Sequence, residues 1–482
     1  MHDKNHNTKE NTCFPKNLDN NKISSKFDHL VKKVAIKLII FLFDKENLYK
    51  KIALTPNSFA PLLNIQQLKQ MLIHAKKISF YKNSFPELNY NLPDDSFLKQ
   101  FKNIDFRIDK KQLKEDTKTF LDFELFKKEN VINYREDSFF PILPKLFRNF
   151  LIPLSTSGST GIPLYFYKSR DSVLRIFFKM AHIMKFFGWK EGENICYIQQ
   201  RGTMPHMDAV RKYASIVGLS LFYPDTIDEK SAREFIQFLE DKKPTVLCGF
   251  PSILSEYALI IKNNKLLLDS SLKFILSGSE ILFENQRKLI QEVFSCPVYN
   301  FYGAVEVGII AAECECQDGL HIFEDSVFLE NNQNKEIIVT TLTQNEMPLI
   351  KYNIGDRGLI TEKTCSCGLM GKKIMVQEIE GRIEEYLIDN FGRKIYGSYF
   401  RQLILEANQK FKDKIINSQI IQKLNKEIKY KLQLRDQFDP QVKNILNYIT
   451  QEIEQKMKLG TNGSIEKNLN TGKKLKFLIR ES

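Results

Sequence analysis

The sequence contains no apolar run long enough to cross a bilayer. Residues 34–43 are apolar, but this segment is only ten residues long and contains Lys37, whereas a spanning helix needs about 20 apolar residues. We expect a helix docked on the domain surface, and a helix lying on a membrane surface is the weaker alternative. The first 21 residues also lack the apolar core of a signal peptide. We therefore expect a cytoplasmic protein.

Internal repeats, coiled-coil heptads and a disulfide framework are also missing. Among the eight cysteines, Cys13, Cys196, Cys248 and Cys296 are scattered singly, as expected for small buried side chains or free thiols. The other four form two Cys-x-Cys pairs, a pattern typical of metal sites rather than of secreted disulfide scaffolds. At 482 residues, the chain is long enough for two or more domains.

Basic residues are in excess, with a net charge of +13. The last 99 residues hold 19 Lys and Arg against 12 Asp and Glu. A Lys-rich solvated surface explains this excess, and an electropositive cleft for ATP, coenzyme A or another polyanion is the sharper interpretation. Aromatic residues are not interleaved with the basic stretch as they are in RNA-binding sheets, so no specific nucleic-acid partner is expected.

The middle of the chain alternates short apolar strands with helices. We predict strands at residues 194–198, 245–248, 273–276 and 298–301, with helices between them. Such alternation indicates a layered α/β core with a largely parallel sheet. Ligands bind such sheets at the carboxyl ends of the strands.

The domain organisation is predicted from shifts in composition. Residues 1–24 are rich in Asn, Lys and Asp and are expected to be disordered. Residues 25–383 are expected to form a large layered α/β domain with mostly parallel sheets and a small β-rich subdomain near residues 336–361. Residues 384–482 mix strands and helices and are expected to form a small, mobile α+β C-terminal cap domain.

A loop rich in hydroxyl residues and glycine is the strongest local signal. It comprises Ser155, Thr156, Ser157, Gly158, Ser159, Thr160 and Gly161. Glycines let a backbone approach phosphate oxygens closely, while hydroxyls and N–H groups donate to them. No Gly-Lys-Ser/Thr follows, so this is not a P-loop.

Four motifs in fixed order carry a resemblance to a known superfamily. They are S-T-S-G-S-T-G-I-P at 155–163, Y-N-F-Y-G-A-V-E-V-G at 299–308, K-Y-N-I-G-D at 351–356 and E-G-R-I-E-E at 380–385. Together they resemble the adenylate-forming superfamily of acyl-CoA synthetases, adenylation domains and luciferases. E-C-E-C-Q-D-G-L-H at 313–321 and C-S-C-G at 365–368 are similar to the phenylacetate–CoA ligase family and its capsule-biosynthesis adenylating relatives. The resemblance covers residues 60–480.

The resemblance assigns roles to individual residues. Glu306 follows a strand end, where its carboxylate suits Mg²⁺ that bridges ATP phosphates and the substrate acid. Asp356 suits the ribose hydroxyls, with Arg382 donating from the other side. The remaining expected residues are Tyr302 and Gly303 near the adenine, Ser279 and Asn300 on the adenine edge, Glu384 as the hinge, and Lys473 as the catalytic lysine of the C-terminal domain.

The sequence also departs from the family pattern. Many relatives carry Lys after the last glycine of the phosphate loop, where this chain has Ile162. The hinge acid is Glu384 rather than Asp. Residues 304–306 read Ala-Val-Glu, where a hydroxyl-bearing residue often precedes the glutamate.

The cysteine pairs and a nearby histidine indicate a structural Zn²⁺ site. Cys314, Cys316, His321, Cys365 and Cys367 are five candidates for four tetrahedral positions. The relatives favour Cys314, His321, Cys365 and Cys367, with Cys316 as the competitor. A closed site of this kind would fix two β segments to each other across a long loop.

Together these patterns predict an AMP-forming acid–thiol ligase. A small carboxylic acid is expected to react with ATP to give an acyl-adenylate, and the acyl group then to pass to coenzyme A. An amine, sugar or carrier protein is the alternative acceptor, and residues 197–207 and 249–251 are expected to line the acid pocket. The alternative from another class is a zinc-stabilised nucleic-acid or scaffold-binding protein on a decayed enzyme fold.

Overall fold

The computed structural model describes residues 63–122, 151–155, 165–198, 218–362, 365–367, 373–375, 381–382 and 386–480, apart from 116, 225, 226, 393, 413, 437 and 467–477. The segment 1–24, the apolar segment 34–43 and the expected domain boundary at 383–384 lie outside this part of the chain. Within it, every helix is too short or too polar to span a membrane.

Five parallel strands form one half of the main sheet, in the order β4 (Leu219–Phe222), β3 (Ile195–Ile198), β5 (Val246–Gly249), β6 (Phe274–Gly278) and β7 (Val298–Ala304). The four strands predicted from the sequence are confirmed, and β4 was not predicted. The helices beside them are α8 (Arg170–Phe186), α10 (Glu229–Lys242), α11 (Pro251–Asn263) and α12 (Glu284–Phe294).

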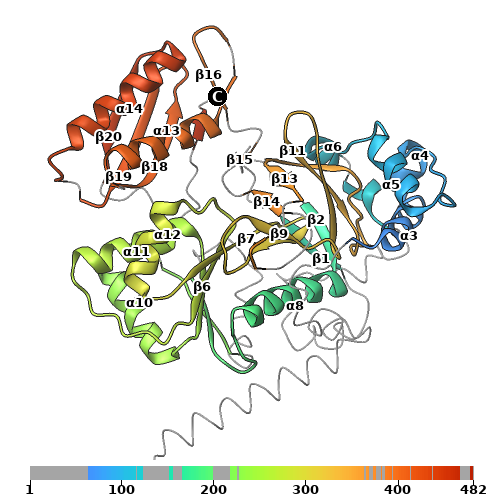
Figure 1. Ribbon diagram of the computed structural model, residues 1–482, viewed down its shortest axis with the longest axis horizontal. Helices are drawn as coiled ribbons and strands as arrows, with labels where there is room; N and C mark the ends of the chain where they lie inside the picture. Colours follow the sequence, from blue (N-terminus) through green and yellow to red (C-terminus); the bar gives the residue numbers. More distant parts are fainter. Residues whose placement is uncertain are drawn as a thin grey trace, which may run out of the picture.

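Alternation of apolar side chains along these strands explains why both faces of the sheet are covered. Cys196, Leu247 and Ile275 pack in one buried cluster with residues of α10, α11 and α12. Their strand neighbours Val246 and Phe274 pack in another cluster with residues of α8. Successive strand residues point to opposite faces, so each strand serves both layers, and Figure 1 shows the helices on the two sides.

The main sheet continues beyond β7 with antiparallel strands, in the order β8 (Gly308–Glu313), β9 (Leu320–Ile322), β14 (Lys373–Met375) and β13 (Leu359–Thr361). A second sheet contains β10 (Val327–Asn331), β11 (Glu336–Thr341), β12 (Tyr352–Arg357) and β15 (Gly381–Arg382). The hairpin of β1 (Leu151–Ser155) and β2 (Tyr165–Ser169) stands beside these sheets. The predicted α/β class with an added β-rich part is confirmed.

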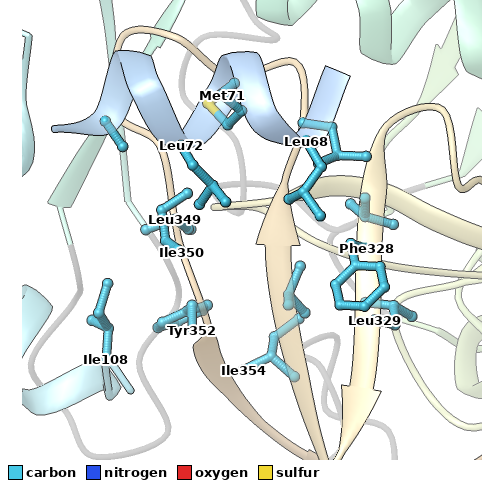
Figure 2. Packing of buried hydrophobic residues seen from close by; sticks show 14 of the residues in the cluster. Leu68, Met71, Leu72, Ile108, Phe328, Leu329, Leu349, Ile350, Tyr352 and Ile354 are labelled. Carbon is cyan, nitrogen blue, oxygen red and sulfur yellow. The ribbon is translucent and has the colours of Figure 1, made fainter. Parts of the chain in front are cut away.

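Short N-terminal helices cover the second sheet. They are α3 (Ile65–Ala75), α4 (Ser79–Ser84), α5 (Asp94–Asn103), α6 (Lys110–Glu115) and the 3₁₀ turn η1 (Thr117–Phe120). Asn64 caps α3 by accepting from the Gln66 and Gln67 amides. Leu68 and Leu72 then face the strands that carry Leu329 and Ile354, as Figure 2 shows.

The C-terminal part has a core of its own. Its elements are β16 (Tyr386–Ile388), β17 (Lys394–Tyr396), α13 (Gly397–Lys410), β18 (Ile415–Gln422), β19 (Ile428–Leu434), α14 (Val442–Met457), β20 (Thr461–Ile465) and β21 (Leu478–Arg480). Ile445, Ile449 and Ile453 repeat at helical spacing on α14 and are fully buried with Tyr430 and Leu432 of β19.

This C-terminal part docks on α11 and α12 mainly through polar side chains. Gln433 donates a hydrogen bond to the Glu256 carboxylate. The Gln286 amide donates to Asn417 Oδ1 at 2.7 Å, and the Asn285 amide donates to the Ile415 carbonyl. Glu256 is 2% exposed, and burial raises its pKa to about 7.

Replacing Glu256 by Gln should raise the stability of the protein at pH 8 but not at pH 4. The raised pKa means that the folded state binds a proton which the unfolded chain releases, so wild-type stability falls as pH rises from about 4.5 to about 7. A neutral amide avoids this loss, which amounts to about 1–3 kcal/mol at pH 8. Urea unfolding of both proteins at pH 4 and pH 8 measures the difference. An equal difference at the two pH values would contradict the assignment.

Candidate active site

The β1–β2 hairpin places the two ends of the phosphate loop side by side. Ser155, the last residue of β1, pairs with Tyr165, the first residue of β2. The loop residues Thr156, Ser157, Gly158, Ser159, Thr160 and Gly161, together with Ile162, lie outside the described residues. The loop's roles therefore stay a prediction, but the structure fixes where the loop starts and ends.

Glu306 lies in the tight turn between β7 and β8. Gly303 and Gly308 approach each other so closely that a Cβ on Gly303 would come within 2.5 Å of the Gly308 carbonyl oxygen, so a side chain at position 303 would push the strands apart. Gly308 has a φ of +102°, a conformation open mainly to glycine. This turn buries Glu306, which is 4% exposed.

Two neighbouring strands hold Glu306 by different groups. The Tyr352 hydroxyl of β12 donates to the Glu306 carboxylate at 3.0 Å. The Lys168 ammonium of β2 donates to the Glu306 main-chain carbonyl at 2.7 Å and to Gln344 Oε1 at 2.5 Å. Burial lowers the pKa of Lys168 to about 8, and the nearby Glu346 and Glu306 carboxylates oppose that shift.

Tyr302 and Asp356 are joined directly. The Tyr302 hydroxyl donates to Asp356 Oδ2 at 2.6 Å, and Asp356 pairs with Arg382 where β12 meets β15. The backbone therefore brings together Asp356 and Arg382, the pair expected to flank the ribose. The side chain of Arg382 lies outside the described part of the structure.

Ser279 directly follows β6, and Asn300 of β7 lies beside Ser277 near the end of β6. The Asn300 amide nitrogen donates to Glu313 Oε2 at 2.6 Å. Its side-chain oxygen Oδ1 is buried and has no hydrogen-bond partner among the described residues. A buried acceptor without a partner is costly, which suits contact with a ligand donor. Ser279 follows β6 with a φ of +67° and is exposed.

All five predicted metal ligands come together at the antiparallel end of the main sheet. The Sγ atoms of Cys314, Cys316, Cys365 and Cys367 lie within 4.8 Å of one another, and Cys314 Sγ lies 3.6 Å from Cys365 Sγ. A tetrahedral Zn²⁺ with Zn–S bonds of about 2.3 Å needs sulfur atoms about 3.8 Å apart. The His321 Nε2 atom lies 3.6 Å from Cys367 Sγ, so it adjoins the four thiols.

Two of the predicted site residues lie outside the part of the chain that the structure describes, and three residues near Glu306 were not predicted. Glu384 and Lys473 lie outside the described residues, so their roles stay predictions. Sequence reasoning missed Lys168, Tyr352 and Gln344. The position of Lys168 in the sequence could have indicated that it is buried. It lies two residues after Phe166, so both side chains point to one face of β2, and both are buried.

No protein-family model matches the sequence. The chain is 24% identical to the protein CapK of Staphylococcus aureus over 248 residues, which is 50% of this chain and 55% of CapK. It is 26% identical to phenylacetate-coenzyme A ligase of Thermus thermophilus over 185 residues, 35% of this chain and 41% of that protein. Indoleacetate–lysine synthetase of Pseudomonas savastanoi is 26% identical over 152 residues, 31% of this chain and 36% of that protein.

These matches span about half or less of each curated relative. A solved structure, 2-hydroxyisobutyryl-CoA ligase in its postadenylation state, covers 86% of this chain and 88% of its own length with a TM-score of 0.64 at 16% identity. The same ligase in the thioesterification state covers 83% of this chain and 85% of its own length with a TM-score of 0.52 at 17% identity. The chain is therefore similar in sequence to parts of these proteins, and its fold is that of 2-hydroxyisobutyryl-CoA ligase. These similarities do not favour the alternative of a zinc-stabilised nucleic-acid or scaffold-binding protein on a decayed enzyme fold.

A buried ion pair supports both the strand that carries Asn300 and the strand that leads to the cysteine cluster. Arg287 of α12 makes two hydrogen bonds to Glu313, at 3.0 and 2.6 Å, and a third to the Val298 carbonyl at 2.6 Å. Glu313 is fully buried, immediately precedes Cys314, and accepts from the Asn300 amide. The pair therefore links the ends of β7 and β8 to α12.

Breaking this pair should destabilise the protein strongly. We expect Arg287→Met to lower the free energy of unfolding by about 3–5 kcal/mol, because it leaves the Glu313 carboxylate buried without its partner. Adding Glu313→Gln in the same chain should recover part of that loss, since the orphaned charge is then removed. Urea unfolding of the single and double variants measures both effects. A loss below about 1 kcal/mol in the single variant would contradict the assignment.

Proposed function

We propose that the chain activates a small carboxylic acid with ATP and then transfers the acyl group to coenzyme A. In the first step a carboxylate oxygen attacks the α-phosphorus of ATP, and the bond to pyrophosphate breaks. In the second step the coenzyme A thiol attacks the acyl carbon, and AMP leaves. The observation that carries the proposal is the buried Glu306 carboxylate, held by Tyr352 and tied through Lys168 to the strand that leaves the phosphate loop.

The residues around Glu306 suit a divalent cation. Glu306 and Glu346 are 4% and 2% exposed and contribute two negative charges near the single ammonium of Lys168. Carboxylates bind Mg²⁺ in nucleotide sites, together with substrate phosphates. Mg²⁺ held by Glu306 would supply charge to neutralise the phosphate oxygens, while the chain's own groups position the reactants.

Other parts of the site have proposed roles in the same reaction. The buried Asn300 Oδ1 acceptor suits the amino group of adenine, and Asp356 suits the ribose hydroxyls. The loop 155–161 would hold the phosphates through its hydroxyl and N–H groups. Residues 384–482 would act as a mobile cap that brings Lys473 to the reacting acid, with Glu384 as the hinge.

Coenzyme A is the proposed acceptor because two of the similar proteins are named as CoA ligases. One relative is named indoleacetate–lysine synthetase, so an amine is the second candidate. A panel of aryl and acyl carboxylates with ATP, scored by hydroxylamine trapping of the adenylate, identifies the acid. Addition of coenzyme A or of lysine in place of hydroxylamine, in a parallel reaction, then identifies the acceptor from the thioester or amide that forms. Failure to form an adenylate with any acid in a broad panel would overturn the proposal.

Replacing Glu306 by Ala should reduce acid-dependent ATP–pyrophosphate exchange to below about a tenth of the wild-type rate. Loss of a carboxylate that acts on the reacting phosphates costs at least a few kcal/mol of transition-state stabilisation. Glu240→Gln, which changes an exposed carboxylate on α10, is the control and should exchange normally. Circular dichroism checks that both variants are folded. A folded Glu306→Ala protein that keeps more than a tenth of the exchange would contradict this role.

The cysteine cluster is proposed to hold one structural Zn²⁺. Four thiolates fill a tetrahedral site and leave no position open for substrate. The mutual approach of the four Sγ atoms favours Cys316 over His321 as the fourth ligand.

Metal analysis distinguishes the two ligand sets. Purified protein should contain about one equivalent of zinc, His321→Gln should keep it, and Cys316→Ser should bind it at least about tenfold more weakly. Cys296→Ser, which changes a cysteine outside the cluster, should leave the zinc content unchanged. Zinc retained by Cys316→Ser but lost by His321→Gln would instead support the set with histidine. Wild-type protein without zinc would reject the site.

A further inference from the structure

Lys168 is a buried ammonium without an assigned role in the proposed reaction. It lies on β2 and is 1% exposed. Buried ammonium groups are rare because taking one out of water costs several kcal/mol unless it is paired. An apolar side chain of similar length would fill the same space at lower cost. The chain therefore keeps a costly charge at this position.

The Lys168 ammonium joins β2, the strand that follows the phosphate loop, to Glu306. Lys168 is three residues after Tyr165, at the base of the loop, and 138 residues from Glu306. Its Nζ donates to the Glu306 main-chain carbonyl and to Gln344 Oε1, at 2.7 and 2.5 Å. Gln344 is itself fixed, because its amide donates to the Met347 carbonyl at 2.8 Å.

The groups around the ammonium are anionic. Glu306 and Glu346 are both buried near it. Ser169, the next residue on β2, donates to Glu346 Oε2 at 3.0 Å, while Glu346 Oε1 has no hydrogen-bond partner among the described residues. Both carboxylates act electrostatically on the ammonium, while its hydrogen bond goes to the main-chain carbonyl of Glu306.

We infer that Lys168 is a positioning residue for Glu306, which ties the turn that carries this carboxylate to the strand that leaves the phosphate loop. The inference rests on the proposed function, because that function gives Glu306 its task. Lys168 fixes the backbone of Glu306, while Tyr352 fixes its carboxylate. Mg²⁺ demands near-ideal octahedral geometry, so a small displacement of Glu306 affects the reaction even where substrate still binds.

The matched control is Lys179, a second buried lysine. Lys168 and Lys179 line the same small cavity with Gly308 and Gln344. Lys179 is 4% exposed and bonds to both oxygens of Asp325, at 2.8 and 2.7 Å. Its Nζ also lies 4.6 Å from the centre of the Phe323 ring. Replacing either lysine by Met removes a buried ammonium, but only Lys168 contacts Glu306.

The experiment measures single-turnover adenylate formation by wild type, Lys168→Met and Lys179→Met, first with Mg²⁺ and then with Mn²⁺. The amplitude reports the fraction of folded active sites, and the rate constant reports the chemistry in those sites. We expect Lys168→Met to lower the Mg²⁺-supported rate constant about tenfold or more. We also expect the ratio of the Mn²⁺ rate to the Mg²⁺ rate to rise about threefold, because misplaced ligands penalise Mg²⁺ most. Lys179→Met should lower the melting temperature but keep the rate constant and the ratio within about twofold of wild type.

Two results overturn the inference, and they differ from failure of the proposed function. Lys168→Met with a normal rate constant and a normal ratio of the Mn²⁺ rate to the Mg²⁺ rate would make Lys168 purely structural, whatever the melting temperature of the variant.

If Lys168→Met does not fold, Gln344→Glu replaces it as the test. Its charged acceptor draws the ammonium away from Glu306, so the rate constant should fall about threefold with the same change in metal ratio. An unchanged ratio there overturns the inference as well. Wild-type protein that forms no adenylate with any acid rejects the proposed function, and the inference with it.

Discussion

Buried charge around Glu306 is the constraint on which the rest of the site depends. Two carboxylates and one ammonium are enclosed there with almost no access to water. Such groups are stable only when each is paired or hydrogen-bonded in good geometry. Lys168 from β2, Tyr352 from β12 and Gln344 from the loop after β11 supply that geometry. The phosphate-loop hairpin, the β7–β8 turn and the second sheet must therefore be in place together.

The change from parallel to antiparallel pairing at β7 explains where the chemistry collects. Strands β3, β5 and β6 end in parallel at one edge of the sheet, where Ser279 and Asn300 lie. The chain then turns back immediately, and the tight β7–β8 turn presents Glu306. The following strands β8 and β9 carry Cys314 and His321 away from that edge. One reversal of strand direction thus separates the Glu306 carboxylate from the cysteine cluster.

The sequence predicted those parts of the site that are local in the chain. Glu306, Asp356 and the Cys-x-Cys pairs stand in short motifs at strand ends, so their neighbourhoods follow from spacing alone. Lys168, Tyr352 and Gln344 could not be assigned in this way, because the contacts that join them to Glu306 and to each other span 46 to 176 residues and depend on how the sheets pack. Strand β4 was missed because Ser220 interrupts the apolar run of Leu219–Phe222, whereas the equally short β3 and β5 each begin with an unbroken apolar run. The choice between Cys316 and His321 was left open for a related reason, since both lie close to Cys314 in the sequence and their distances from Cys365 and Cys367 depend on the fold.

The interface of the C-terminal part differs in kind from the cores on either side of it. Within each part, fully buried aliphatic and aromatic side chains make contacts that water cannot replace. Across the interface, Gln433 and Gln286 make hydrogen bonds that water can replace at little net cost, and Ile416 adds an apolar contact to the cluster that α11 and α12 share. An interface with such exchangeable polar contacts is typical of parts that separate and dock again. Two apolar cores joined in this way suit the proposed reaction, in which the C-terminal part would act as a mobile cap.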